Sequence, residues 1–110
     1  MRKALITGGG RGIGKSIADK FVANGYDVCT PSRADMDLSN EESVKMFIEA
    51  HNHEYFDVII NNAGINEINL IDCITDEEIK MTMQVNLISP IMLLRAFTGA
   101  MKTRQYGRIV

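Results

Sequence analysis

The sequence predicts an α/β fold, in which a parallel sheet is built from βαβ units. Short apolar runs alternate with longer segments of helical periodicity, and a glycine-rich stretch joins the first run to the first helical segment. The 110 residues are 45% hydrophobic and 24% charged. Such a composition suits one compact domain with a single core, and it excludes a disordered or collagen-like chain.

Four short apolar runs are expected to form the strands, at residues 4–6, 27–30, 57–60 and 107–110. Pro31 closes the second strand because proline cannot donate to a ladder. The chain ends within the fourth run, and we therefore expect the sheet to be incomplete at the C-terminus.

Three helices are expected between these strands. The first covers residues 12–23, ends at Asn24-Gly25, and turns one apolar face inward. The second starts at a capping box, residues 39–42, in which Ser39 is the cap. The third is a long helix that starts at a similar box, residues 75–78. The expected inward residues are Ile13, Ile17, Phe21 and Val22 in the first helix, Val44, Phe47 and Ile48 in the second, and Ile79, Met83, Leu87, Met92, Leu94 and Phe97 in the third.

Charge and apolar patterning exclude several classes of protein. Twelve basic and fourteen acidic residues give a net charge of −2, with no long basic run for nucleic acid. The longest apolar stretch, residues 87–94, is too short to span a bilayer. Cys29 and Cys73 stand alone, as free thiols do in a reducing cytoplasm. His51 and His53 lack further ligands nearby, so no metal site is expected.

The glycine-rich stretch is the strongest functional signal. Five of the seven residues 8–14 are glycine. Without Cβ atoms the backbone turns tightly and approaches a ligand, and the N-terminus of the following helix attracts phosphate. A tight turn without a ligand needs fewer glycines, so we predict a phosphate site.

Two phosphate-binding motifs fit this stretch. Residues 9–16 match G-x-x-x-x-G-K-S, the nucleoside triphosphate P-loop, with Lys15 on the phosphates and Ser16 on magnesium. Residues 7–14 match T-G-x-x-x-G-x-G, a variant of the dinucleotide fingerprint, although the stricter G-x-G-x-x-G fails because Ile13 occupies its last glycine position. Spacing alone does not decide between them.

The end of the third apolar run favours the dinucleotide motif. A P-loop protein usually needs an aspartate after another apolar strand to hold magnesium. Residues 58–60 are followed instead by Asn61-Asn62-Ala63-Gly64, which offers amides and no carboxylate.

With these motifs the chain resembles the short-chain dehydrogenase/reductase family. Three motifs carry the resemblance in order: T-G-x-x-x-G-I-G at residues 7–14, N-N-A-G at 61–64, and the asparagine of V-N-L at Asn86. It runs over all 110 residues and covers the first half of such a domain. The resemblance implies a Rossmann-type, doubly wound parallel sheet with strand order 3-2-1-4-5.

This chain departs from the family pattern between Arg33 and Asp37, where no room remains for the helix and third strand that many members carry. We expect a minimal third strand. Residues 1–110 then form one partial NAD(P)-binding domain, truncated at the start of strand five. The cofactor-binding residues implied are Thr7, Gly8, Gly10, Arg11, Gly12, Ile13, Gly14, Ser32, Arg33, Asp37, Leu38, Asn62, Ala63 and Gly64.

The end of the second strand predicts NADP(H) over NAD(H). Dinucleotide fingerprints place a carboxylate about twenty positions past the glycines to hold the ribose hydroxyls. Here Ser32-Arg33 occupies that place, and a hydroxyl followed by a guanidinium suits the extra phosphate of NADP. Arg11 adds a second cation, and Asp37-Leu38 matches the family pair that contacts adenine.

Asn86 is the candidate catalytic residue of this chain. Pro90 lacks an N–H, so the carbonyl of Asn86 loses its helical partner and must find water or a ligand. In the resembled family this asparagine helps to hold a water in the proton relay to the catalytic lysine. A packing kink whose carbonyl is satisfied by solvent is the alternative.

The resemblance implies an NADP-dependent oxidoreductase that moves hydride between nicotinamide and a carbonyl or alcohol substrate, of 3-oxoacyl or similar type. The family's serine, tyrosine and lysine are absent here: no lysine lies four residues after Tyr26, Tyr55 or Tyr106. The 110-residue chain alone is therefore expected to be inactive, and the full-length protein to be a cytoplasmic homo-oligomer. A P-loop nucleotide-binding protein and a non-catalytic dinucleotide-binding module remain the alternatives.

Overall fold

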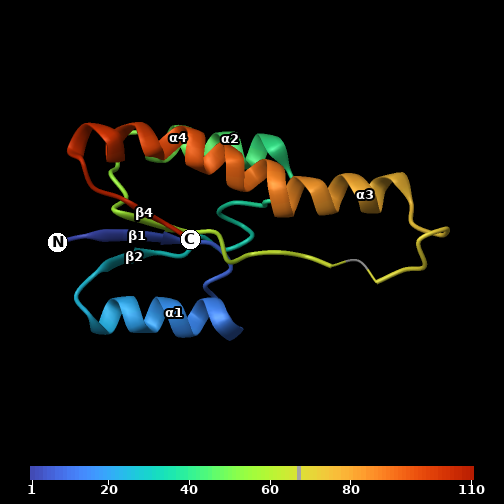
Figure 1. The fold of residues 1–110 in the computed structure, drawn as a ribbon, viewed down its shortest axis with the longest axis horizontal. Coiled ribbons are helices and arrows are strands. Elements are labelled where there is room, and N and C mark those ends of the chain that lie inside the picture. The colour runs from blue at the N-terminus through green and yellow to red at the C-terminus, as the bar shows by residue number, and fades with distance from the viewer. Residues whose placement is uncertain (67) are drawn as a thin grey trace.

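A computed structural model describes residues 1–66 and 68–110 of the chain. Its strands and helices follow the predicted alternation (Figure 1). In chain order they are β1 (Lys3–Ile6), α1 (Gly12–Ala23), β2 (Asp27–Cys29), α2 (Glu41–His51), β3 (Val58–Ile60), α3 (Asp76–Met83), the π-helical segment η1 (Gln84–Ile88), α4 (Ser89–Arg104) and β4 (Arg108–Ile109).

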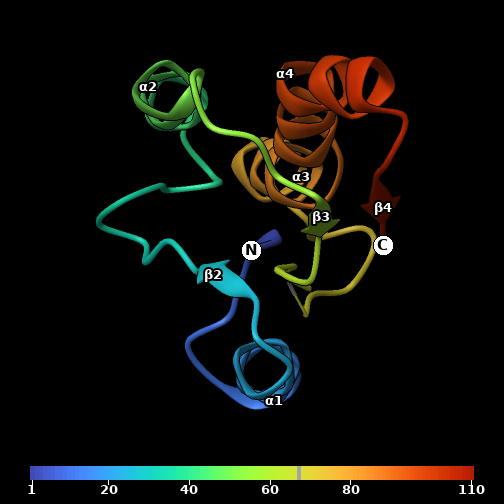
Figure 2. The ribbon, with the colours of Figure 1, turned by 90° about the vertical axis from the view of Figure 1, so that its left-hand side faces the viewer.

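The four strands form one sheet in the order β2-β1-β3-β4, and every neighbouring pair is parallel. Ala4 of β1 lies opposite Val28 on one side and Val58 on the other. Helix α1 covers one face of the sheet, and α2 and α4 cover the other (Figure 2). The predicted doubly wound α/β sheet is confirmed.

The minimal third strand that we expected is not formed in the part of the chain described. The residues between β2 and α2 form turns, and β2 is the edge of the sheet. Pro31 cannot donate to a ladder. The chain then reverses directly, because the backbone N–H groups of Asp35 and Met36 both donate to the carbonyl of Ser32, at 3.0 and 2.9 Å.

The core consists of two apolar clusters, one on each face of the sheet. Alternate residues of each central strand point to opposite faces, as pleating requires. Leu5 and Ile59 join the cluster under α2 and α4, whereas Ala4, Ile6, Val58 and Ile60 join Ala18 of α1.

Helix α1 has the predicted bounds, but the prediction that Ile13 and Val22 lie in the core is wrong. Ile13 is 74% exposed and Val22 is 59% exposed. The buried residues are Gly14 and Ala18, one turn apart, with Ile17 and Phe21 packed at their side. Small residues occupy the centre of the contact face and let α1 lie close to the sheet.

Helix α2 begins one residue later than the capping box predicted. Its N-cap is Asn40, whose side chain accepts from the backbone N–H of Ser43 at 3.2 Å. Ser39 instead donates its hydroxyl to Asp37. Helix α3 is capped as predicted, because Thr75 Oγ1 accepts from the N–H of Glu78 at 3.1 Å.

The predicted long helix is continuous but not regular. A wide π-helical turn, η1, separates α3 from α4, and the N–H of Ser89 reaches the carbonyl of Gln84. Pro90 follows directly and breaks the usual hydrogen-bond ladder. Helix α3 extends beyond the sheet (Figure 1), so Ile79 and Met83 are exposed. Leu87 of η1 is exposed too, whereas Met92 and Phe97 of α4 are buried. Among the described helices, none is long and apolar enough to cross a membrane.

Candidate functional site

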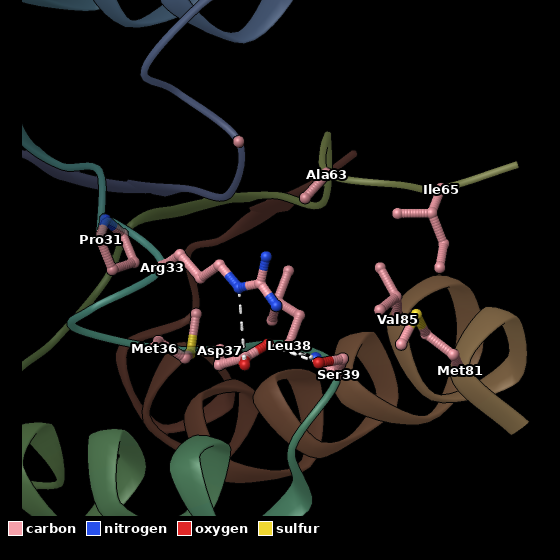
Figure 3. A pocket seen from close by; sticks show the side chains of 11 residues that line it. Pro31, Arg33, Met36, Asp37, Leu38, Ser39, Ala63, Ile65, Met81 and Val85 are labelled. Atoms are coloured by element: carbon pink, nitrogen blue, oxygen red, sulfur yellow. Dashed lines mark hydrogen bonds and ion pairs between the residues drawn. The ribbon is translucent and has the colours of Figure 1, made fainter. Parts of the chain in front are cut away.

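A cavity of about 260 Å³ opens at the carboxyl ends of β1, β2 and β3 (Figure 3). Three connections and one helix segment form its walls: the glycine loop after β1, the turns after β2, the loop after β3 and the region around η1. The lining residues are Gly8, Pro31, Arg33, Met36, Asp37, Leu38, Ser39, Ala63, Ile65, Met81 and Val85.

Three glycines of the loop are required by packing within the protein. Gly8 has a φ of +67°, which side chains rarely adopt. A Cβ on Gly14 would lie 2.1 Å from the carbonyl oxygen of Gly8, and one on Gly9 would lie 2.4 Å from Cγ2 of Thr30. These contacts hold the start of α1 directly beneath the loop.

The remaining part of the loop is open. A Cβ on Gly10 or Gly12 would meet no atom of the described residues within 4 Å. Arg11 is the N-cap of α1, and within the described structure its side chain makes no capping hydrogen bond. The first N–H groups of α1 therefore lack a side-chain cap, and an anion can take that place.

The loop after β3 is tied to the glycine loop by two side chains. Thr7 is 3% exposed, and its Oγ1 accepts from the N–H of Ala63 at 3.1 Å. Nδ2 of Asn62 donates to the carbonyls of Thr7 and Gly8, both at 3.2 Å. Two motifs whose contacting residues are 54 to 56 apart in the sequence are thus brought together at one edge of the sheet.

Asn86 fastens the same loop to η1. Its Oδ1 accepts from the N–H of Ile65 at 2.9 Å, and its Nδ2 donates to the carbonyl of Ile65 at 2.7 Å. A Cβ on Gly64 would lie 3.2 Å from Asn86 Oδ1. The side chain therefore clamps the backbone after Gly64, and the predicted role of the Asn86 carbonyl stays a prediction.

Arg33 lies over the cavity, where its guanidinium points toward Asp37 (Figure 3). The side chain is 84% exposed, and its Nε lies 3.6 Å from Oδ2 of Asp37. The hydroxyl and N–H of Ser39 donate to Oδ1 of Asp37 at 2.6 and 3.0 Å. Chiefly the Ser39 hydroxyl, and less strongly Arg33, lower the pKa of Asp37 below its ordinary value.

Ser32 does not line the cavity with Arg33. Its hydroxyl and N–H donate to Oδ2 of Asp35, at 2.9 and 3.0 Å, and these bonds lower the pKa of Asp35. Asp35 lines a separate hollow with Cys29 and His51. The first carboxylate after β2 in the chain therefore lies outside the cavity lining, whereas the next one, Asp37, belongs to it.

Some of the predicted cofactor residues line the cavity, together with residues that were not predicted. Gly8, Arg33, Asp37, Leu38 and Ala63 line the cavity, whereas Gly12 and Ile13 line a different hollow along α1. Sequence reasoning missed Pro31, Met36, Ser39, Ile65, Met81 and Val85. Helical spacing alone does not distinguish a core face from a cavity wall, so it could not identify Met81 and Val85 as lining residues.

Asn61 was also missed as a polar group of this edge. Its Oδ1 is buried and has no hydrogen-bond partner among the described residues. Such an acceptor is rare in a folded protein and needs water or a ligand. Both asparagines belong to the N-N-A-G motif, but only Asn62 was assigned to the cofactor.

Lys15, which the P-loop alternative places on phosphates, is engaged elsewhere. Its Nζ lies 2.7 Å from Oδ2 of Asp19, on the exposed surface of α1. The two residues are one helical turn apart, and such ion pairs are common on solvent-exposed helix surfaces.

Comparison with known proteins decides the family. The sequence model described as short chain dehydrogenase matches residues 33–110. The chain belongs to the short-chain dehydrogenase family. A 3-oxoacyl-[acyl-carrier-protein] reductase FabG from Vibrio cholerae is 30% identical over 97% of this chain and 52% of its own length. The chain thus spans about half the length of the curated relatives it matches. That alignment is 127 residues long, so the relative carries residues that this shorter chain lacks.

Solved structures of the family have the same arrangement. A 4-hydroxyisoleucine dehydrogenase complexed with NADH is 25% identical, with a TM-score of 0.90 over 99% of this chain and 54% of that one. A metagenomic short-chain oxidoreductase in complex with NADP is 26% identical, with a TM-score of 0.77 over 98% and 59%. The Rossmann-type fold follows from these likenesses.

Proposed function

We propose that the chain is the cofactor-binding half of an oxidoreductase that prefers NADP(H) to NAD(H). Its chemistry is hydride transfer between the nicotinamide and a carbonyl or alcohol group, and the bound cofactor supplies the hydride. The observation that carries the preference is the exposed Arg33 over the cavity, together with Asp35 turned away from it.

The residues present fit such a cofactor. The uncapped N-terminus of α1 and the open backbone at Gly10 and Gly12 suit a pyrophosphate. Met36 and Leu38 offer apolar contacts for an adenine ring. A guanidinium carries five N–H donors, so Arg33 keeps most of them for a phosphate while its Nε faces Asp37.

The substrate class is proposed from the relatives. Several are 3-oxoacyl-[acyl-carrier-protein] reductases, and we propose a carbonyl substrate of that or a similar kind for the full-length protein. Asn86 is proposed to hold a water by its carbonyl. The 110-residue chain has no serine, tyrosine and lysine set of the expected spacing, so we propose that it binds cofactor without turnover.

The test is a pair of titrations of this chain with NADPH and NADH, followed by the fluorescence of the reduced nicotinamide. Arg33→Ala is expected to weaken NADPH binding by about 10- to 100-fold, because charge-assisted hydrogen bonds to the extra phosphate are lost. The affinity for NADH should stay unchanged. Arg95→Ala, an exposed arginine on α4, is the matched control. Equal affinity of the native chain for both cofactors would overturn the NADP preference.

A further inference from the structure

One buried hydroxyl holds the backbone segment that forms the floor of the cavity. Ser89, the first residue of α4, is 0% exposed, and its Oγ donates to the carbonyl of Leu38 at 2.6 Å. Nε2 of Gln84 donates in turn to Ser89 Oγ at 2.9 Å. The result is a chain of hydrogen bonds from η1, through the interior, to the backbone of a residue that lines the site.

The π-helical turn explains why these two side chains meet. Residues five apart do not face each other on a regular α-helix, where neighbours are three or four apart. In η1 the N–H of Ser89 donates to the carbonyl of Gln84, so residues 84 and 89 are aligned by the wider turn. Their side chains then form the second link between the same two residues.

A second hydroxyl holds the other side of the same short segment. The N–H of Asp37 donates to Oγ of Ser43, in α2, at 2.8 Å. Residues 37–39 are therefore fixed between two helices, by Ser43 at Asp37 and by Ser89 at Leu38. The segment also carries the ion-pair partner of Arg33, whose Nε lies 3.6 Å from Oδ2 of Asp37.

We propose that Ser89 is a positioning residue that sets the affinity of the site for the adenosine end of its dinucleotide. The proposal rests on the proposed function above. Ser89 touches no ligand: it holds the Leu38 carbonyl, and through it the apolar and charged groups under the adenine and its ribose phosphate. Removing the hydroxyl leaves a partly buried carbonyl without its donor, and we expect the segment to shift so that this carbonyl reaches water.

The test compares Ser89→Ala with Thr98→Ala in the 110-residue chain. Thr98 is the matched control, because its hydroxyl donates to the Leu94 carbonyl within α4 and lies outside the cavity lining. Two ligands are titrated: NADPH, and adenosine 2′,5′-bisphosphate, which carries only the adenosine end. Hydrogen exchange of the Asp37 and Ser39 amides, which donate to Ser43 Oγ and Asp37 Oδ1, reports the order of the segment without ligand.

Ser89→Ala is expected to weaken the binding of both ligands by the same factor. That factor should be about three- to tenfold, which corresponds to the loss of one hydrogen bond. Exchange of the Asp37 and Ser39 amides should accelerate, and Thr98→Ala should change neither property. A folded Ser89→Ala chain that binds both ligands as the native chain does would overturn the positioning role and leave the proposed function intact. A native chain that binds neither NADPH nor NADH would overturn the proposed function and this role with it.

Gln84→Leu is the second variant, for the case that Ser89→Ala does not fold. It removes the donor that orients the Ser89 hydroxyl and keeps that hydroxyl in place. A smaller loss, about two- to threefold for both ligands, is expected from one weakened hydrogen bond. No loss in a folded Gln84→Leu chain, when Ser89→Ala is unfolded, would overturn the proposal.

Discussion

The α-carbon of Gly14 lies so close beneath Gly8 that a Cβ there would sit 2.1 Å from the Gly8 carbonyl oxygen and 2.4 Å from Nδ2 of Asn62. Backbone and a hydrogen-bonded amide cannot yield as the end of a flexible side chain does. Gly14→Ala is expected to lower the free energy of unfolding by roughly 3 kcal/mol, an overpacking cost, measured by urea denaturation.

Gly10→Ala is the control within the same loop. A Cβ there meets no described atom within 4 Å, and the φ of Gly10 is not in the left-handed region. Its free energy of unfolding should stay within about 0.5 kcal/mol of the native value. If Gly10→Ala proved as destabilising as Gly14→Ala, the division of the loop into a packed and an open part would be wrong.

The ion pair between Lys3 and Glu54 predicts a pH dependence of stability. The two side chains are hydrogen-bonded and mostly shielded from solvent. The Lys3 hydrogen bond lowers the pKa of Glu54 below its ordinary 4.5, and the Glu54 hydrogen bond raises the pKa of Lys3 above its ordinary 10.5. The carboxylate's contribution is thus complete above pH 4.5 and is lost as the pH falls through the lowered pKa. The ammonium's contribution is complete below pH 10.5 and is lost as the pH rises through the raised pKa.

Glu54→Gln should therefore cost about 1 kcal/mol of unfolding free energy at pH 7 and flatten its decline in acid. Urea denaturation between pH 3 and pH 7 measures both effects. Glu49→Gln, an exposed glutamate on α2, is the control and should follow the native curve. A parallel decline of native and Glu54→Gln chains in acid would show that Glu54 contributes nothing to it.

Local patterns were sufficient where neighbouring residues decide the structure. The bounds of α1 follow from glycines before it and Asn24-Gly25 after it, and the Thr75 cap follows from its own box. The glycine loop and the Asn62 loop meet at one edge, because the carboxyl ends of parallel strands meet there.

Features that depend on distant partners could not be predicted in this way. Ser39 and Asn40 are both good caps, and the choice of Asn40 depends on Ser39 being engaged by Asp37. The orientation of Ser32 away from Arg33 depends on Asp35. The link from Ser89 to Leu38 joins residues 51 apart, and no local pattern reports such a contact.

Helix α3 depends on its cap more than the other helices do. It extends beyond the sheet and has no buried residue in the described structure, so packing contributes little to it. Thr75→Ala removes the acceptor for the Glu78 N–H and should cost about 1 kcal/mol locally. Faster hydrogen exchange of the Glu78 and Ile79 amides would show this, whereas Thr103→Ala, near the end of α4, should leave them unchanged. Unaltered exchange in Thr75→Ala would mean that neighbouring contacts, and not the cap, hold the first turn.

The two cysteines should differ in reactivity. Cys73 is exposed, whereas Cys29 is half-buried in β2, and burial is the main cause that raises the pKa of its thiol. The thiolate is the nucleophile, so iodoacetamide at pH 7.5 should modify Cys73 several-fold faster than Cys29. Mass spectrometry of samples quenched at successive times measures both rates, and Cys73→Ser should remove the fast phase alone. Equal rates at the two positions would mean that the edge strand β2 opens as readily as the exposed loop around Cys73.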